Sequence, residues 1–100
     1  MNISVTGRQL EITESIRGQV QRRADKLPHF WDRVRDLDAI LEKRGSHTYR
    51  AELVVHADGA DPFIASVKHD DLYAAIDEAA TKLERQVRNH HAKLVDHKHA

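Results

Sequence analysis

Residues 70–94 of this chain read DDLYAAIDEAATKLERQVRNHHAKL, the longest helical pattern in the sequence. The apolar residues recur at steps of three and four, the period of a helix with one buried side. They are Leu72, Ile76, Ala79, Ala80, Leu83 and Val87. Acids come first and bases follow, an order that complements the helix macrodipole and so has a purely local explanation. The stretch predicts one long helix with a core stripe.

The bases of this helix are sorted around its axis as well as along it. At about 100° per residue, one flank of the core stripe holds Lys82, Arg85, Asn89 and Lys93. The opposite flank is mixed in sign and holds Asp77, Glu84 and Arg88. A merely solvated face usually interleaves both signs, so this one-sided arrangement favours a polyanionic partner.

An earlier helix is predicted after Thr13, whose hydroxyl suits an N-cap. Its apolar stripe consists of Ile16, Val20, Ala24 and Leu27. We expect an end or a kink near Pro28, although helical spacing continues through Phe30, Trp31 and Val34. One flank of this helix is also basic, with Arg22, Arg23 and Lys26. Two such helices on one sheet predict a continuous basic strip, and chance sorting of charges stays open as an alternative.

Alternating apolar and polar residues predict four strands. The first is a short strand around Ile3 and Val5 that Gly7 breaks, and the others lie within residues 36–42, 50–57 and 63–68. Gly45-Ser46 and Asp58-Gly59 mark the turns between the last three. The order β-α-β-β-β-α and the single stripe on each helix predict an α+β two-layer sandwich, with both helices on one face of a four-stranded sheet.

Composition limits the possible functions. The 100 residues suit one domain, which we place at 1–95, followed by a short tail at 96–100. Equal numbers of bases and acids, 16 each, mean that any polyanion site depends on local sorting. The chain has no cysteine, no long apolar segment and no basic leader, so we expect a cytoplasmic protein without membrane contact.

Catalytic and metal-binding chemistry find little support in the sequence. The candidate nucleophiles and bases are Ser46-His47, Ser66 and His69-Asp70, without a phosphate loop or a nucleophile elbow. The histidines near the end are His90, His91, His97 and His99, and no carboxylate or cysteine spacing completes a metal set. We therefore expect no enzyme activity, no cofactor, no metal site and no small-molecule substrate.

Nearly the whole chain resembles the family of ribosome hibernation promoting factors and ribosome-associated inhibitors (sigma modulation proteins), in its short form. The matching residues are Ile3-Ser4-Val5-Thr6-Gly7, Leu10-Glu11-Ile12-Thr13-Glu14, Lys26-Leu27, Asp71-Leu72-Tyr73-Ala74-Ala75-Ile76-Asp77 and Lys82-Leu83-Glu84-Arg85-Gln86. The resemblance implies the same β-α-β-β-β-α fold.

The resemblance also implies a function. Family members bind the small ribosomal subunit in the messenger and transfer RNA channel, silence translation under stress or in stationary phase, and promote or stabilise inactive ribosome dimers. A separate ribosome modulation factor is an implied partner. Carried over by position, the residues facing ribosomal RNA are Arg22, Arg23, Lys26, Lys82, Arg85, Asn89 and Lys93. Arginine forks and lysine charges suit phosphate contacts that read no base sequence.

Two alternatives remain open at this point. A double-stranded RNA-binding module also places helices on one sheet face, but normally sets bases where this chain has Asp70-Asp71. A protein-interaction module of similar fold, such as a sigma-factor modulator, is the other. Tyr73 falls at an aromatic position of the family, and we expect it to pack rather than to contact RNA.

Overall fold

The computed structural model describes residues 1–98, and the side chains of residues 1–95. The elements in chain order are β1 (Asn2–Arg8), α1 (Glu14–Ala24), a 3-10 turn (Leu27–His29), β2 (Val34–Arg44), β3 (Thr48–Ala57), β4 (Phe63–His69) and α2 (Leu72–Lys98). This order confirms the predicted β-α-β-β-β-α arrangement.

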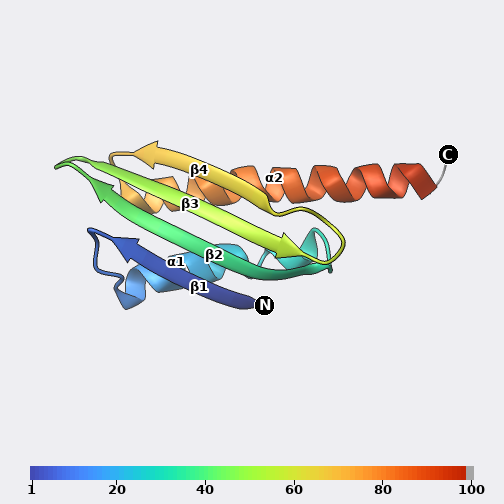
Figure 1. The fold of residues 1–100 in the computed structure, drawn as a ribbon, viewed down its shortest axis with the longest axis horizontal. Coiled ribbons are helices and arrows are strands. Elements are labelled where there is room, and N and C mark those ends of the chain that lie inside the picture. Colours follow the sequence, from blue (N-terminus) through green and yellow to red (C-terminus); the bar gives the residue numbers. More distant parts are fainter. Residues whose placement is uncertain (99–100) are drawn as a thin grey trace.

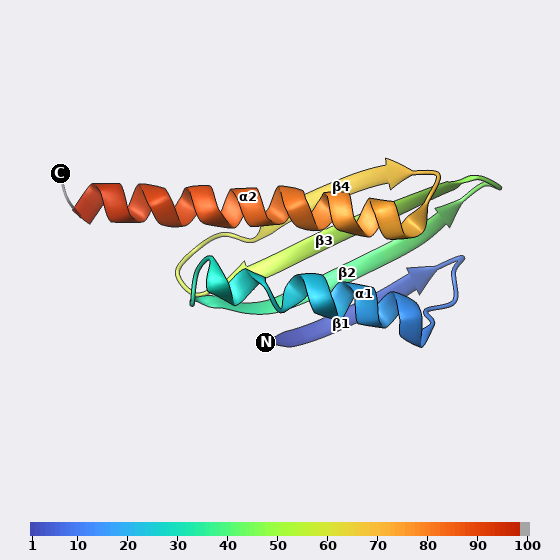
Figure 2. The ribbon, with the colours of Figure 1, turned by 180° about the vertical axis from the view of Figure 1, so that it is seen from behind.

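The four strands form one sheet in the order β1-β2-β3-β4. β1 pairs with β2 in parallel, whereas β2, β3 and β4 form an antiparallel meander. Both helices cover the same sheet face and run in the same direction, with α1 over β1 and α2 over β3 and β4 (Figures 1 and 2). The two-layer α+β sandwich is therefore confirmed.

The core lies between this sheet face and the helices, and strand alternation supplies half of it. The inward residues of the two central strands are fully buried: Leu37, Ala39, Leu41, Ala51, Leu53 and Val55. The predicted stripe of the last helix is buried against them, from Leu72 to Val87. The other sheet face carries the alternate residues, which are mostly polar but include Ile40, Val54 and Ile64.

The first helix begins as predicted and ends earlier than predicted. The Thr13 hydroxyl accepts a hydrogen bond from the Ile16 amide at 3.2 Å, which confirms the N-cap. α1 ends at Ala24, and Pro28 lies inside the separate 3-10 turn. The helical spacing through Val34 was misleading, because Val34 begins β2. A proline without an amide hydrogen suits the short turn better than a helix interior.

Gly7 does not break the first strand, contrary to the prediction. β1 continues to Arg8, and Gly7 pairs with Leu41 of β2. A Cβ atom on residue 7 would lie 2.2 Å from the Leu10 carbonyl oxygen. Glycine is needed here because the chain turns back close to its own strand.

The last helix begins at Leu72, since Asp71 acts as its cap. The Asp71 carboxylate accepts from the Tyr73 amide at 2.9 Å and from the Ala74 amide at 3.4 Å. α2 then runs past the end of the sheet to Lys98 (Figure 1). Within the predicted tail the backbone of residues 96–98 is helical. The side chains of that tail, including His97 and His99, and residues 99–100 lie outside the described part.

Candidate nucleic-acid interface

The basic flank of α2 is open to solvent. Its four predicted RNA-binding residues are exposed: Lys82, Arg85, Asn89 and Lys93. No ion pair within the described residues involves the three bases among them. Lys82 and Arg85 line a shallow hollow together with Asp77, Glu78 and Thr81. Their positive charges are available to an external anion.

Two of the three bases predicted for the first helical segment are exposed, one near the end of α1 and one just past it. Arg22 and Lys26 are both exposed. Arg22 donates a 2.6 Å hydrogen bond to the side-chain oxygen of Gln19, while Lys26 has no ion-pair partner among the described residues. Both side chains therefore remain usable for phosphate contacts.

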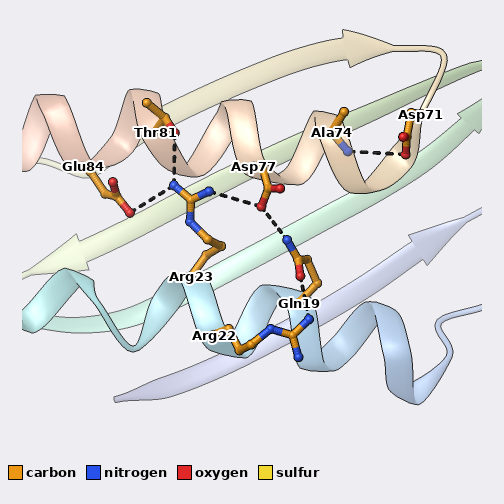
Figure 3. Close-up of polar contacts among 8 residues, drawn as sticks. All are labelled: Gln19, Arg22, Arg23, Asp71, Ala74, Asp77, Thr81 and Glu84. Carbon is orange, nitrogen blue, oxygen red and sulfur yellow. Dashed lines mark hydrogen bonds and ion pairs between the residues drawn. The ribbon is translucent and has the colours of Figure 1, made fainter.

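Arg23, also predicted to bind RNA, is instead engaged between the helices. Its guanidinium donates to Asp77 at 3.1 Å, to Thr81 at 3.0 Å and to Glu84 at 3.2 Å (Figure 3). The Arg23 side chain is only 19% exposed. Its Nε is buried without a hydrogen-bond partner among the described atoms. The structure thus gives Arg23 a contact between helices in place of a free charge.

The predicted continuous basic strip is therefore divided. Arg23 of α1 pairs with the flank of α2 that carries Asp77 and Glu84, and not with the flank that carries the free bases of α2. Gln19 extends the same network, because its amide also donates to the Asp77 carboxylate (Figure 3). Lys82 and Arg85 stand beyond these acids rather than directly against Arg23. Of the predicted bases, those without an ion pair fall into two groups: Lys82, Arg85 and Lys93 on α2, and Arg22 and Lys26 at and just past the end of α1.

Sequence reasoning placed Asp77 and Glu84 on a mixed flank and missed their pairing with Arg23. The available signal was the spacing of Asp77, Thr81 and Glu84, four and then three residues apart on one helical side. That spacing gives α2 three acceptors in a row. Which base they would meet depends on the rotation of α1, and the apolar stripe sets that rotation only coarsely.

The second half of α2 is held by an aromatic cluster, which consists of Trp31, Phe63, His90 and His91. Trp31 is 5% exposed, and its ring lies 6.5 Å from Phe63, 5.0 Å from His90 and 6.3 Å from His91. The Nδ1 atom of His91 lies 3.0 Å from the Phe30 carbonyl oxygen. These contacts fix the helix segment that precedes Lys93.

Tyr73 lies at the start of α2 and does not pack into the core. It is 41% exposed, and its hydroxyl donates to the Ser15 hydroxyl at 2.9 Å. Tyr73 therefore contacts α1 instead of the core, and that it packs rather than contacts RNA stays a prediction. Tyr73 links the first turns of the two helices.

Within the part of the chain that the structure describes, no three His, Asp or Glu side chains gather closely enough to hold a metal ion. No helix in this part combines the length and the apolar content that crossing a membrane requires.

Comparison with known families agrees with this fold. The family model described as "Sigma 54 modulation protein / S30EA ribosomal protein" matches residues 3–95. The chain belongs to this family, and the resemblance seen in its sequence is confirmed. Within the family it is similar to proteins named ribosome hibernation promoting factor.

Two such relatives and one solved structure illustrate the match. The Escherichia coli K12 protein is 35% identical over 97 residues, which cover 97% of this chain and 100% of the relative. The Bacillus subtilis protein, named ribosome hibernation promotion factor, is 32% identical over 95 residues, covering 94% of this chain and 50% of the relative. The crystal structure of the Thermus thermophilus Protein Y N-terminal domain is 36% identical, with a TM-score of 0.81 over 89% of this chain and 98% of that domain.

Proposed function

We propose that this protein is a ribosome hibernation factor that binds the small ribosomal subunit in the messenger and transfer RNA channel. Binding there excludes the translation substrates, so inhibition is steric and no reaction is catalysed. The protein acts in the cytoplasm during stress or stationary phase, and it favours inactive ribosome dimers, with a separate ribosome modulation factor as a further partner.

The observation that carries this proposal is membership of the family together with similarity to named hibernation factors along nearly the whole chain. The exposed bases supply a matching chemistry. They are Arg22, Lys26, Lys82, Arg85 and Lys93, with the amide of Asn89 beside them. Such side chains bind phosphate oxygens without reading base sequence, which suits a folded ribosomal RNA surface.

Binding to double-stranded RNA is the less favoured function. Asp70 and Asp71 are exposed at the start of α2. In that class of module this helix start meets phosphates, which the two carboxylates would repel. The words "Sigma 54 modulation" in the family description keep a protein partner as the second candidate.

Co-sedimentation with purified small subunits and whole ribosomes over a salt series tests the proposal. We expect affinity to fall with salt, by a log–log slope of about −0.7 to −0.9 for each phosphate contact. The double variant K82E/R85E should lose most binding and flatten that slope. Adding R22E/K26E should weaken binding further.

A matched control changes the same charge elsewhere. Lys43 and Lys68 are exposed strand residues without ion-pair partners among the described residues. The variant K43E/K68E should bind nearly as the wild type does. Equal losses in both double variants would refute the site. Preference of the wild type for a free RNA duplex over ribosomes would refute the proposed partner.

A further inference from the structure

Arg23 lies between the two helices, where its charge is paired with carboxylates of the same protein. Its terminal nitrogens donate hydrogen bonds to two carboxylates and one hydroxyl, at 3.0 to 3.2 Å. Glu84 is 16% exposed and Asp77 is 45% exposed, so the pair to Glu84 is the better shielded. A carboxylate that accepts these hydrogen bonds occupies guanidinium N–H groups that would otherwise donate to a phosphate.

The clamp, defined as Asp77, Thr81 and Glu84 around Arg23, leaves the guanidinium incompletely satisfied. Arg23 has five N–H donors, yet its buried Nε has no partner among the described atoms. An unpaired buried donor disfavours the state that contains it. This unpaired donor lowers the net stability of the clamp.

The clamp also adjoins the proposed RNA-binding surface. Asp77 and Thr81 line the same shallow hollow as Lys82 and Arg85. A phosphate bound by Lys82 or Arg85 would meet the negative charge of Asp77 close by. A released Arg23 would instead add a bidentate donor at this edge.

From this geometry we propose that Asp77 and Glu84 withhold Arg23 from ribosomal RNA and thereby limit the affinity of the surface. The inference rests on the proposed function and deepens it, because it names the residues that set how tightly the same site binds. Neutralising the two acids frees Arg23 for one more phosphate contact.

The test compares D77N/E84Q with the wild type in binding to purified small subunits over a salt series. Hydrogen bonds to charged groups contribute enough for one added contact to tighten binding about ten-fold. The log–log slope should steepen by about 0.7 to 0.9. The triple variant R23Q/D77N/E84Q should bind more weakly than the double variant and lose the steeper slope, since it lacks the arginine that the double variant releases. Any gain that it keeps over the wild type measures the repulsion removed with Asp77.

A matched control neutralises two exposed acids outside the clamp and outside both helices, Glu11 and Asp61, which have no ion-pair partner among the described residues. E11Q/D61N changes the net charge equally and should leave the slope unchanged. If it steepens the slope as D77N/E84Q does, the effect is one of overall charge and the inference fails. It fails as well if the double and triple variants bind alike.

Two further outcomes separate this inference from the proposed function. A wild-type chain that does not bind subunits overturns both. A wild-type chain that binds, with D77N/E84Q unchanged in affinity and slope, overturns the clamp alone. Should the double variant fail to fold, D77N and E84Q each release one of the two pairs, and each should give a smaller gain in the same direction.

Discussion

α2 packs on the sheet through its buried stripe from Leu72 to Val87, and beyond that stripe its two halves make different further contacts. The first half faces α1 through the polar clamp around Arg23. The second half places its own His90 and His91 against the buried ring of Trp31, which also contacts Phe63. An apolar contact stabilises in proportion to its buried area, whereas a partly exposed ion pair contributes little net stability. Beyond the shared stripe, the aromatic contacts therefore add more stability than the clamp does, and the clamp sets the surface charge of the first half.

Removing the aromatic anchor should have the largest effect on stability. W31A deletes a side chain that is 5% exposed, so we expect the free energy of unfolding to fall by about 3–5 kcal/mol. Urea denaturation followed by circular dichroism measures it. W31F keeps a ring in place and should lose less. A loss below about 1 kcal/mol for W31A would remove the contrast between the two halves.

Replacing Arg23, the base at the centre of the clamp, should lower the free energy of unfolding by less. R23M leaves Asp77 and Glu84 without their cation, and we expect a loss of about 1–3 kcal/mol in urea denaturation. Sodium chloride should shrink the difference from the wild type, because salt screens partly exposed pairs. The variant R23M/D77N/E84Q should regain part of the loss. Equal stability of R23M and wild type would show that the clamp holds nothing.

A smaller loss is expected at His91. H91A removes the ring that stacks on Trp31 and the contact with the Phe30 carbonyl, about 1 kcal/mol together. Trp31 is the single tryptophan, so its fluorescence reports this change directly. H56A is the matched control, since His56 contacts Asp38 on the other sheet face. Unchanged emission in H91A would contradict the proposed packing.

The smallest effect is expected where the two helices begin. Y73F removes only the exposed bond between the Tyr73 and Ser15 hydroxyls, worth about 0.5 kcal/mol or less. A double-mutant cycle with S15A measures it. A coupling above about 1 kcal/mol would mean that the polar boundary stabilises more than its exposure suggests.

Most of the fold could be predicted because it depends on local periodicity. Strand alternation located β2, β3 and β4 to within a few residues, and the stripe from Leu72 to Val87 located α2. The local misjudgements came from close approaches of the backbone. Neither the contact of position 7 with the Leu10 carbonyl nor the 3-10 turn around Pro28 has a periodic signal.

The candidate site was harder to predict, since it depends on how the helices are turned toward each other. The exposed positions of Lys82 and Lys93 follow from the helical period alone. The contacts of Arg23 do not follow from it, because two of its acceptors, Asp77 and Glu84, lie 54 and 61 residues away along the chain. The arrangement of side chains around one helix does not predict which side chains of the neighbouring helix face it.

The length of α2 limits how much RNA its basic flank would touch in the proposed complex. From Lys82 to Lys93 the helix rises about 16 Å, at about 1.5 Å per residue. Each step along one nucleic-acid strand in a duplex advances about 3.4 Å, so this flank spans roughly five nucleotides. In the proposed complex, a footprint this short would fit one segment of a folded RNA.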